Sequence, residues 1–246
     1  MNHSTEIQET VRLSEVSKVF GTNGYSTFAI RDASISVWPG ELVLLLGPSG
    51  SGKTTLLTLM AGLLKPTTGS VWLFGKNIED HSDESRQLLR AHKLGFIFQN
   101  FLLIESLSVL ENIMLVLKFA GTPKEEGLAT AHRLLREFGI EHLASRLPHR
   151  LSQGEKQRVA IARAIANGAE LIIADEPTAS LESRQALEII QLLKRMAKEG
   201  NRCVVVASHD LRLIAHADRV LRLHDGSIEP AEQRGIEINP EVEHVA

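Results

Sequence analysis

The chain contains one cysteine, few aromatic residues and no excess of positive charge. Cys203 is the only cysteine among 246 residues and lies in an apolar run, so we expect a small buried hydrophobe and a protein of a reducing compartment. Lys and Arg total 27 against 30 Asp and Glu, a net charge of -3, which gives no electrostatic reason to expect a nucleic-acid partner. Aromatic residues make up 4% of the chain, which disfavours a base-stacking platform and indicates an aliphatic core.

Long apolar runs are also absent. The longest ones, residues 42–46 and 113–117, are far shorter than the ~18–20 residues that cross a bilayer. The first residues contain neither the basic region nor the apolar stretch of a secretory signal. If the protein works at a membrane, we therefore expect another chain to carry it there.

The composition is that of an ordinary globular protein. Hydrophobic residues make up 43% and charged residues 23%, which excludes a wholly disordered, collagen-like or coiled-coil chain. Three short apolar runs, at 42–46, 171–174 and 203–207, are typical of strands that are buried on both faces of a parallel sheet. Helical patterns alternate with these runs, so the sequence predicts βαβ units and an α/β fold.

The pattern changes to helix between residues 100 and 167. Apolar residues recur there at three-to-four spacing, and helix formers dominate 152–166. We expect a helical subdomain over 100–167, inserted into an α/β core made of residues 1–99 and 168–228. Residues 229–246 hold five glutamates and one arginine, which predicts an acidic, solvated or loosely docked tail.

One motif directly after the first of these strands fits the phosphate-binding pattern G-x-x-x-x-G-K-[ST]. It consists of Gly47, Pro48, Ser49, Gly50, Ser51, Gly52, Lys53 and Thr54. The glycines let backbone N–H groups surround a phosphate, and the helix expected to begin at Thr55 adds a favourable dipole end. Lys53 would reach the β- and γ-phosphates, and the Thr54 hydroxyl would ligate Mg²⁺. These residues and Thr55 therefore predict a site for ATP and Mg²⁺.

Two carboxylates follow the buried run at 171–174. Asp175 and Glu176 are expected at the carboxyl end of a central strand, where open α/β sheets bind their ligands. Asp175 would hold Mg²⁺, and Glu176 would act as the general base for the water that attacks the γ-phosphate. Two solvated acids at a strand end are the alternative, which the phosphate-binding motif disfavours.

A further set of motifs shows a family resemblance. The segment 151–158, Leu-Ser-Gln-Gly-Glu-Lys-Gln-Arg, resembles the LSGGQ signature of ABC-type ATP-binding cassettes. The other matching positions are Gln99 of a Q-loop, Asp175-Glu176, a D-loop-like Ala179-Ser180-Leu181-Glu182, and Ser208-His209-Asp210. The resemblance covers residues 11–228 and identifies 1–246 as a single cassette.

The resemblance implies a P-loop NTPase fold of the RecA-like type, with N-terminal antiparallel strands beside the parallel core and an inserted helical signature subdomain. It also implies a homodimer that holds two ATP head to tail, so that the signature of one copy faces the phosphates bound by the other. Gln99 is then expected at Mg²⁺ and in catalysis, and His209 at the γ-phosphate. The second phosphate site would begin at the helix N-cap and consist of Ser152, Gln153, Gly154 and Glu155.

An aromatic side chain is expected against adenine near the first strand. Phe20 occupies the family's position, where tyrosine is more usual, and Tyr25 is the other candidate. The chain departs from the family pattern at three positions. Gln153 replaces a glycine of LSGGQ, Glu155 replaces its glutamine, and Glu182 replaces the D-loop aspartate.

The resemblance also implies partners and a location. In transporters of this family the segment after Gln99 forms a groove for a helix of the membrane subunit. Integral membrane permease subunits are therefore expected, with peripheral attachment at the cytoplasmic face of the inner membrane. Ala174 and Ser183 are similar to the macrolide-exporter and lipoprotein-release group, which includes glycolipid exporters of filamentous cyanobacteria, so an exporter with a periplasmic adaptor joined through the permease is expected.

Other functions stay open at this point. One alternative is an importer ATPase for amino acids or ions. Another is a soluble ABC-type ATPase, but the stretch from Gln99 to Ser152 leaves no room for the long coiled-coil insert that such proteins usually carry. A non-hydrolytic nucleotide switch is disfavoured because Glu176 and His209 are both present.

Overall fold

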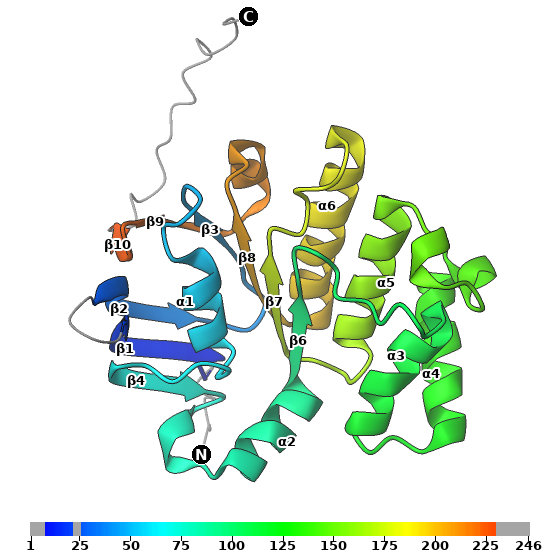
Figure 1. Cartoon of the computed structure of the whole chain (residues 1–246), viewed down its shortest axis with the longest axis horizontal. Helices are drawn as coiled ribbons and strands as arrows, with labels where there is room; N and C mark the ends of the chain where they lie inside the picture. The colour runs from blue at the N-terminus through cyan, green and yellow to red at the C-terminus, as the bar shows by residue number, and fades with distance from the viewer. Residues whose placement is uncertain (1–7, 22–25, 230–246) are drawn as a thin grey trace, which may run out of the picture.

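The structure consists of two β-sheets and the helices that cover them (Figure 1). It is a computed structural model that describes residues 8–21 and 26–229. Tyr25, the second adenine candidate, and the expected acidic tail after Glu229 lie outside the described residues.

The larger sheet has six strands in the order β10-β9-β3-β8-β7-β6. Within the described chain, β9, β3, β8, β7 and β6 run parallel and β10 pairs antiparallel with β9. All residues of β3, β7 and β8 are buried, as expected for strands covered on both faces. The strands are β3 (Leu42–Leu46), β6 (Leu94–Ile97), β7 (Leu171–Asp175), β8 (Cys203–Ser208), β9 (Arg219–His224) and β10 (Ser227–Glu229). The predicted parallel core is confirmed.

The smaller sheet is antiparallel, with the order β2-β1-β4-β5. It lies at the left of Figure 1, beside α1. Its strands are β1 (Val11–Phe20), β2 (Thr27–Val37), β4 (Thr68–Leu73) and β5 (Lys76–Asn77). The expected N-terminal antiparallel strands are therefore present.

Six α-helices and four short 3₁₀ segments complete the described chain. The α-helices are α1 (Lys53–Met60), α2 (Asp83–Lys93), α3 (Val109–Phe119), α4 (Lys124–Glu137), α5 (Gln153–Ile165) and α6 (Ser183–Gly200). The 3₁₀ segments are Ile78–Asp80, Glu141–Leu143, Pro148–Arg150 and Leu211–His216. None of these helices is long and apolar enough to cross a bilayer.

Two helices differ from the expectation. α1 begins at Lys53 rather than at Thr55, because Gly52, in the left-handed conformation with φ 105°, serves as its N-cap. Lys53 and Thr54 are therefore part of the helix. α2 was not expected; it contains no buried residue, and its only large apolar side chains are Leu88 and Leu89.

Apolar side chains fill both faces of the six-stranded sheet. Successive residues of a strand point to opposite faces, so Leu44 and Val206 pack with α3, α4, α5 and α6, whereas Val43 and Val205 pack with α1 and the antiparallel sheet. Cys203 belongs to the second cluster and is 0% exposed, which confirms it as a buried hydrophobe. The first cluster joins the sheet to α3–α5 without a break, so the division at residues 100–167 remains a prediction.

A buried amide holds the irregular segment between β6 and α3. Asn112 of α3 is 1% exposed, and its Oδ1 accepts a hydrogen bond from the Ile104 N–H at 2.8 Å. Its Nδ2 donates to the carbonyl oxygens of Ile104, Leu107 and Ser108 at 3.2, 3.0 and 3.0 Å. One side chain thereby joins the start of α3 to the irregular segment before it.

Asp218 ties the first residue of β3 to the neighbouring elements. Its Oδ2 accepts a hydrogen bond from the Leu42 N–H at 2.8 Å, and its Oδ1 lies 2.9 Å from Nζ of Lys198. Burial acts to raise the pKa of this carboxyl, but the hydrogen bonds from Leu42 and Lys198 outweigh it and hold the pKa below its usual value. The ionised form is therefore the one that stabilises the fold.

We expect Asp218→Asn to lower the free energy of unfolding at neutral pH by about 1 kcal/mol, since a charge-assisted hydrogen bond is replaced by a neutral one. Because the folded pKa is lowered, this stabilisation is present above about pH 4 and is lost as the pH falls through the folded pKa. Urea unfolding at pH 7 and at pH 3 measures the effect. An equal difference between variant and wild type at the two pH values would contradict it.

Candidate nucleotide-binding site

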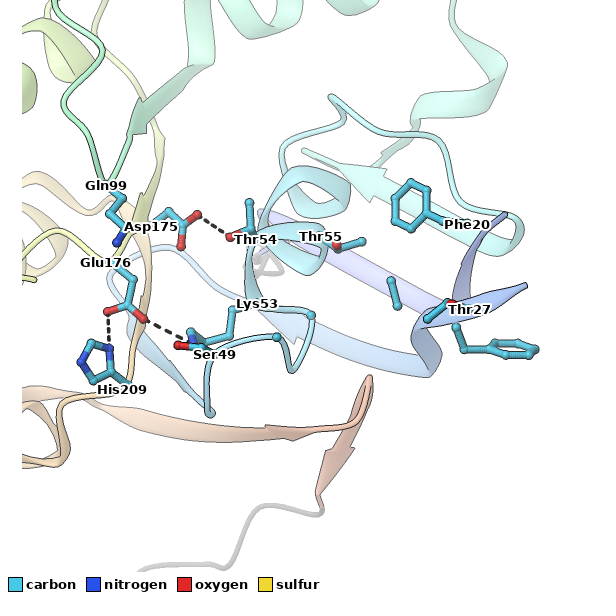
Figure 2. Close-up of a pocket in the computed structure, with 14 residues that line it drawn as sticks. Phe20, Thr27, Ser49, Lys53, Thr54, Thr55, Gln99, Asp175, Glu176 and His209 are labelled. Carbon is cyan, nitrogen blue, oxygen red and sulfur yellow. Dashed lines mark hydrogen bonds and ion pairs between the residues drawn. The ribbon is translucent and has the colours of Figure 1, made fainter. Parts of the chain in front are cut away.

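A pocket of about 440 Å³ opens at the carboxyl ends of the parallel strands, between them and the antiparallel sheet. Figure 2 shows Gln99, Asp175, Glu176 and His209 on one side and Phe20 on the other. The pocket is lined by Phe20, Thr27, Phe28, Ala29, Ser49, Gly50, Gly52, Lys53, Thr54, Thr55, Gln99, Asp175, Glu176 and His209. Residues from distant parts of the sequence thus meet at one edge of the sheet, as strand order predicts.

The loop between β3 and α1 requires its glycines. Gly50 and Gly52 have φ of 83° and 105°, values that side-chain-bearing residues rarely adopt. A Cβ at Gly47 would collide with the carbonyl oxygen of Leu223, and a Cβ at Gly52 with that of Ala29. The loop therefore lies close against its neighbours. The first residues of α1, Lys53, Thr54 and Thr55, line the pocket, and the N-terminus of a helix favours an anion.

Lys53 is folded back onto this loop. Its Nζ donates to the carbonyl oxygens of Gly47 and Pro48 at 2.8 and 3.1 Å, and it lies 3.3 Å from Oε1 of Glu176. The residue is 7% exposed, so these three oxygens take the place of water around a buried ammonium group. Gly47 and Pro48 thus hold Lys53 through their carbonyl oxygens. Ser51 of the same loop is buried, and its Oγ has no hydrogen-bond partner within the described residues.

Oxygen donors gather beside the lysine. Thr54 Oγ1 donates to Asp175 Oδ2 at 2.7 Å, and Gln99 lines the same side of the pocket. Burial, and to a lesser extent the neighbouring charge of Glu176, raise the pKa of Asp175 against the opposing effects of Thr54 and Lys53. A hydroxyl, a carboxylate and an amide oxygen are ligands that suit Mg²⁺, which takes its remaining ligands from water and phosphate. The donor set fits this ion.

Glu176 stands at a bend of the chain. It follows the last residue of β7, has a φ of 47°, and donates its N–H to the Ala207 carbonyl at 2.9 Å. This left-handed conformation is costly for glutamate. It turns the carboxylate toward both Lys53 and His209, whose Nδ1 lies 3.0 Å from Oε2 (Figure 2). The expected base and its histidine are therefore in direct contact.

The comparisons with known proteins agree with this geometry. The family model described as "ABC transporter" matches residues 30–179. A hemin import ATP-binding protein, HrtA, of Staphylococcus haemolyticus is 42% identical over 219 residues, which cover 89% of this chain and 99% of that protein. The chain belongs to the ABC transporter family. As such it is an ATP-binding cassette and an ATPase, and the resemblance drawn from its motifs is confirmed.

Two further proteins are similar to this chain over most of its length. The macrolide export ATP-binding/permease protein MacB of Hahella chejuensis is 35% identical over 89% of this chain, which spans 33% of that larger protein. A dimeric post-hydrolysis structure of the cassette MJ0796, bound to ADP and Pi, superimposes with a TM-score of 0.85 at 38% identity, covering 92% of this chain and 100% of that one. The predicted P-loop NTPase fold is confirmed.

The side of the cassette opposite the carboxylates holds the adenine candidate. Phe20 is the last residue of β1 and is 47% exposed. Nζ of Lys18 lies 5.3 Å from the centre of the Phe20 ring. Sequence reasoning missed Thr27, Phe28 and Ala29, which line the pocket from β2. These residues enter the pocket because β1 pairs with β2, which sets Thr27 opposite Phe20 and Phe28 opposite Val19. The register of the two strands is needed to identify them.

The signature segment of the cassette does not line this pocket. Ser152 is the N-cap of α5: its Oγ accepts from the Glu155 N–H at 3.3 Å, and Glu155 Oε2 accepts from the Ser152 N–H at 2.7 Å. The predicted N-cap is therefore confirmed. Gln153 is exposed, and Gly154 lies against the side chain of Gln185, so this end of the helix is open to a ligand from outside the chain.

Glu155 has a structural contact besides its predicted one. Its carboxylate forms the capping box with Ser152, whose hydrogen bonds lower the pKa of this side chain. This box stabilises the start of α5. The nucleotide contacts of Ser152, Gln153, Gly154 and Glu155 stay predictions.

Proposed function

We propose that this cassette is the nucleotide-binding subunit of an exporter-type ABC transporter, in which two copies close around two ATP and drive a membrane permease. The observation that carries the proposal is the contact of Glu176 with both Lys53 and His209 in a pocket that also holds Thr54 and Asp175. A phosphate cradle, Mg²⁺ ligands and a base are thereby supplied by one chain.

The residues divide the reaction among them. Glu176 accepts a proton from a water molecule whose oxygen attacks the γ-phosphorus, while the bond to the bridging oxygen of ADP breaks. Lys53 and the loop N–H groups hold the phosphates, and His209 orients the Glu176 carboxylate and the γ-phosphate. Thr54, Asp175 and Gln99 would hold Mg²⁺, which supplies positive charge against the phosphate oxygens. Phe20 would stack on adenine.

A second copy completes the site. Ser152, Gln153 and Gly154 lie at an exposed helix N-terminus outside the pocket, and such an end favours an anion. In a symmetric homodimer this end of each copy would face the γ-phosphate held by the other. The dimeric structure of MJ0796 supports a dimer of cassettes. ATP binding then closes the dimer, and hydrolysis releases it.

An apolar groove marks the side on which a permease would dock. It has a volume of about 270 Å³ and runs between β6 and the ends of α3 and α5. Leu102 and Phe119, which line it, are 56% and 69% exposed. Large apolar side chains in contact with water favour a protein partner, and an apolar groove is a common site for an amphipathic helix. Phe98 and Leu102, which line the groove, lie on either side of Gln99 in the chain, so a bound helix would act close to the nucleotide.

The direction of transport rests on the sequence relatives. Ala174 and Ser183 favour the macrolide-exporter group, and the relative MacB is named for macrolide export, whereas HrtA is named for hemin import. We favour export, with an importer as the alternative, and a periplasmic adaptor joined through the permease. The cassette would then lie on the cytoplasmic face of the inner membrane, held there by its permease.

We expect Phe119→Glu to abolish co-purification with the permease and to leave the ATPase rate of the isolated cassette unchanged, because a charge replaces the most exposed apolar side chain of the groove. Affinity purification from detergent-solubilised membranes that contain the tagged cassette and its permease measures this. Leu88→Glu on α2, where Leu88 is 53% exposed, is the matched control. Recovery of a detergent-free complex with nucleic acid instead of a membrane protein would contradict the transporter function.

A further inference from the structure

The segment after Gln99 has a backbone conformation that needs an external restraint. Phe101 and Leu102 have φ of 58° and 46°, in the left-handed region. Residues other than glycine rarely adopt this region, and when they do it is usually as single residues rather than in pairs. The Leu102 side chain is 56% exposed, so its burial does not hold the chain in this shape. Within the segment, Phe101 N–H bonds the Phe98 carbonyl at 3.0 Å and Leu102 N–H bonds the Asn100 carbonyl at 2.6 Å. These turns leave the next carbonyls free.

Arg163 of α5 binds those two carbonyls. One guanidinium N–H donates to the Leu102 oxygen at 2.5 Å, and another donates to the Phe101 oxygen at 2.7 Å. Burial lowers the pKa of this guanidinium, and none of the charged residues that the structure describes counteracts it. The planar fork thus holds two successive carbonyls in the orientation that the left-handed backbone presents.

The helix that carries Arg163 also carries the signature at its other end. Ser152 caps the N-terminus of α5, and Arg163 lies in its last turn, roughly 15 Å away at the rise of an α-helix. α5 packs tightly on β6, because a Cβ at Gly95 would collide with the Ala164 carbonyl. Arg163, Leu102 and Phe119 line the same groove. A single rigid helix therefore connects the groove to the exposed Ser152 end.

We propose that Arg163 is a positioning residue that makes the segment after Gln99 and helix α5 move as one body. Through its two bonds it sets the placement of Gln99 in the pocket, and it transmits displacement of the groove to the Ser152 end of α5. Among the described residues, no other side chain donates to both of these carbonyls. The proposal rests on the proposed function in two respects, namely that Gln99 serves hydrolysis and that a permease docks in the groove.

The test uses the full-length cassette and separates positioning from packing. We expect Arg163→Ala to lower kcat for ATP hydrolysis by about tenfold, because a loosened segment misplaces Gln99. The affinity for ATP, measured without Mg²⁺, should change by less than about twofold, because the phosphate loop stays intact. Adding Leu102→Gly to this variant should recover part of the loss, since glycine adopts a positive φ without a restraint. Arg133→Ala is the matched control, as Arg133 forms an exposed ion pair with Glu137 in α4.

Two results would overturn the proposal. One is a kcat of Arg163→Ala equal to that of wild type. The other is a loss of kcat that accompanies a lower melting temperature and is not relieved by Leu102→Gly, which would make Arg163 a packing residue. If Arg163→Ala simply fails to fold, Arg163→Lys replaces it. That variant keeps the charge but not the two-pronged fork, and wild-type kcat in it would equally overturn the proposal.

A second measurement separates this proposal from the proposed function. ATPase activity is compared with and without the permease in detergent micelles. We expect stimulation of the wild type and a ratio near one for Arg163→Ala. A wild type that the permease neither binds nor stimulates would refute the transporter function, while the kcat measurements still decide the role of Arg163. Equal stimulation of both proteins would refute transmission through Arg163.

Discussion

Glu176→Gln is expected to lower the rate of ATP hydrolysis by about 10²–10⁴-fold, the range attributed to a positioned general base. The amide has nearly the shape of the carboxylate, so it fits between Lys53 and His209, where the carboxylate oxygens lie 3.3 and 3.0 Å from the two nitrogens. It cannot accept the proton of the attacking water. The phosphate loop and Mg²⁺ ligands are untouched, so ATP binding should persist.

The same variant should accumulate as a closed dimer. If ATP closes two copies and hydrolysis opens them, a cassette that binds but does not hydrolyse stays closed. Size-exclusion chromatography with ATP and Mg²⁺, set beside a phosphate-release assay, measures both effects. Glu170→Gln is the matched control, because Glu170 precedes β7 as Glu176 follows it and is exposed in an ion pair with Lys93. Hydrolysis at the wild-type rate by Glu176→Gln would show that another group is the base.

Lys53→Ala is expected to weaken ATP binding by about 10²-fold. A charge-assisted hydrogen bond contributes about 1.5–3 kcal/mol, and each 1.4 kcal/mol is a factor of ten in affinity. Lys53 is 7% exposed and is held by two carbonyls and Glu176. Because the site is buried, water does not compensate for the charge that the substitution removes. The loss should appear in the dissociation constant as well as in the rate, which distinguishes it from Glu176→Gln.

Isothermal titration calorimetry with ATP and Mg²⁺ measures the loss. Lys93→Ala is the control, since Lys93 makes an exposed ion pair with Glu170 away from the pocket. Circular dichroism must show that the variant is folded, because removal of Lys53 also leaves the buried Glu176 carboxylate without its cation. An unchanged dissociation constant in a folded variant would remove Lys53 from the phosphate site.

Several features could be predicted from the sequence because they depend on local pattern. The continuous apolar runs predicted β3, β7 and β8, since only strands covered on both faces lack polar residues. The glycines, Lys53 and Thr54 predicted the loop between β3 and α1. Ser152, expected as an N-cap, predicted the start of α5. Glu155 stands three residues later, at the spacing of a capping box, so this contact is also local.

Other features depend on what the fold brings together. Helix α2 buries no residue and has only two large apolar side chains, Leu88 and Leu89, so a search for core-forming segments passes over it. Thr27, Phe28 and Ala29 enter the pocket through the register of β1 with β2. The bonds of Arg163 to Phe101 and Leu102 span about sixty positions of the chain, from residues 101 and 102 to 163. No local pattern marks an arginine that binds distant carbonyls.

The shortage of aromatic residues and of membrane-spanning segments is a property of the sequence alone, and so are the phosphate-binding motif and the signature that identify the chain as an ABC cassette. These follow from residue types at fixed spacing, which the local backbone turns into a loop or a helix start. Only the tertiary structure decided that Glu176 contacts Lys53 and that Arg163 joins the groove to α5. Those contacts arise between residues far apart in the chain, where packing of the sheet and helices sets the distances.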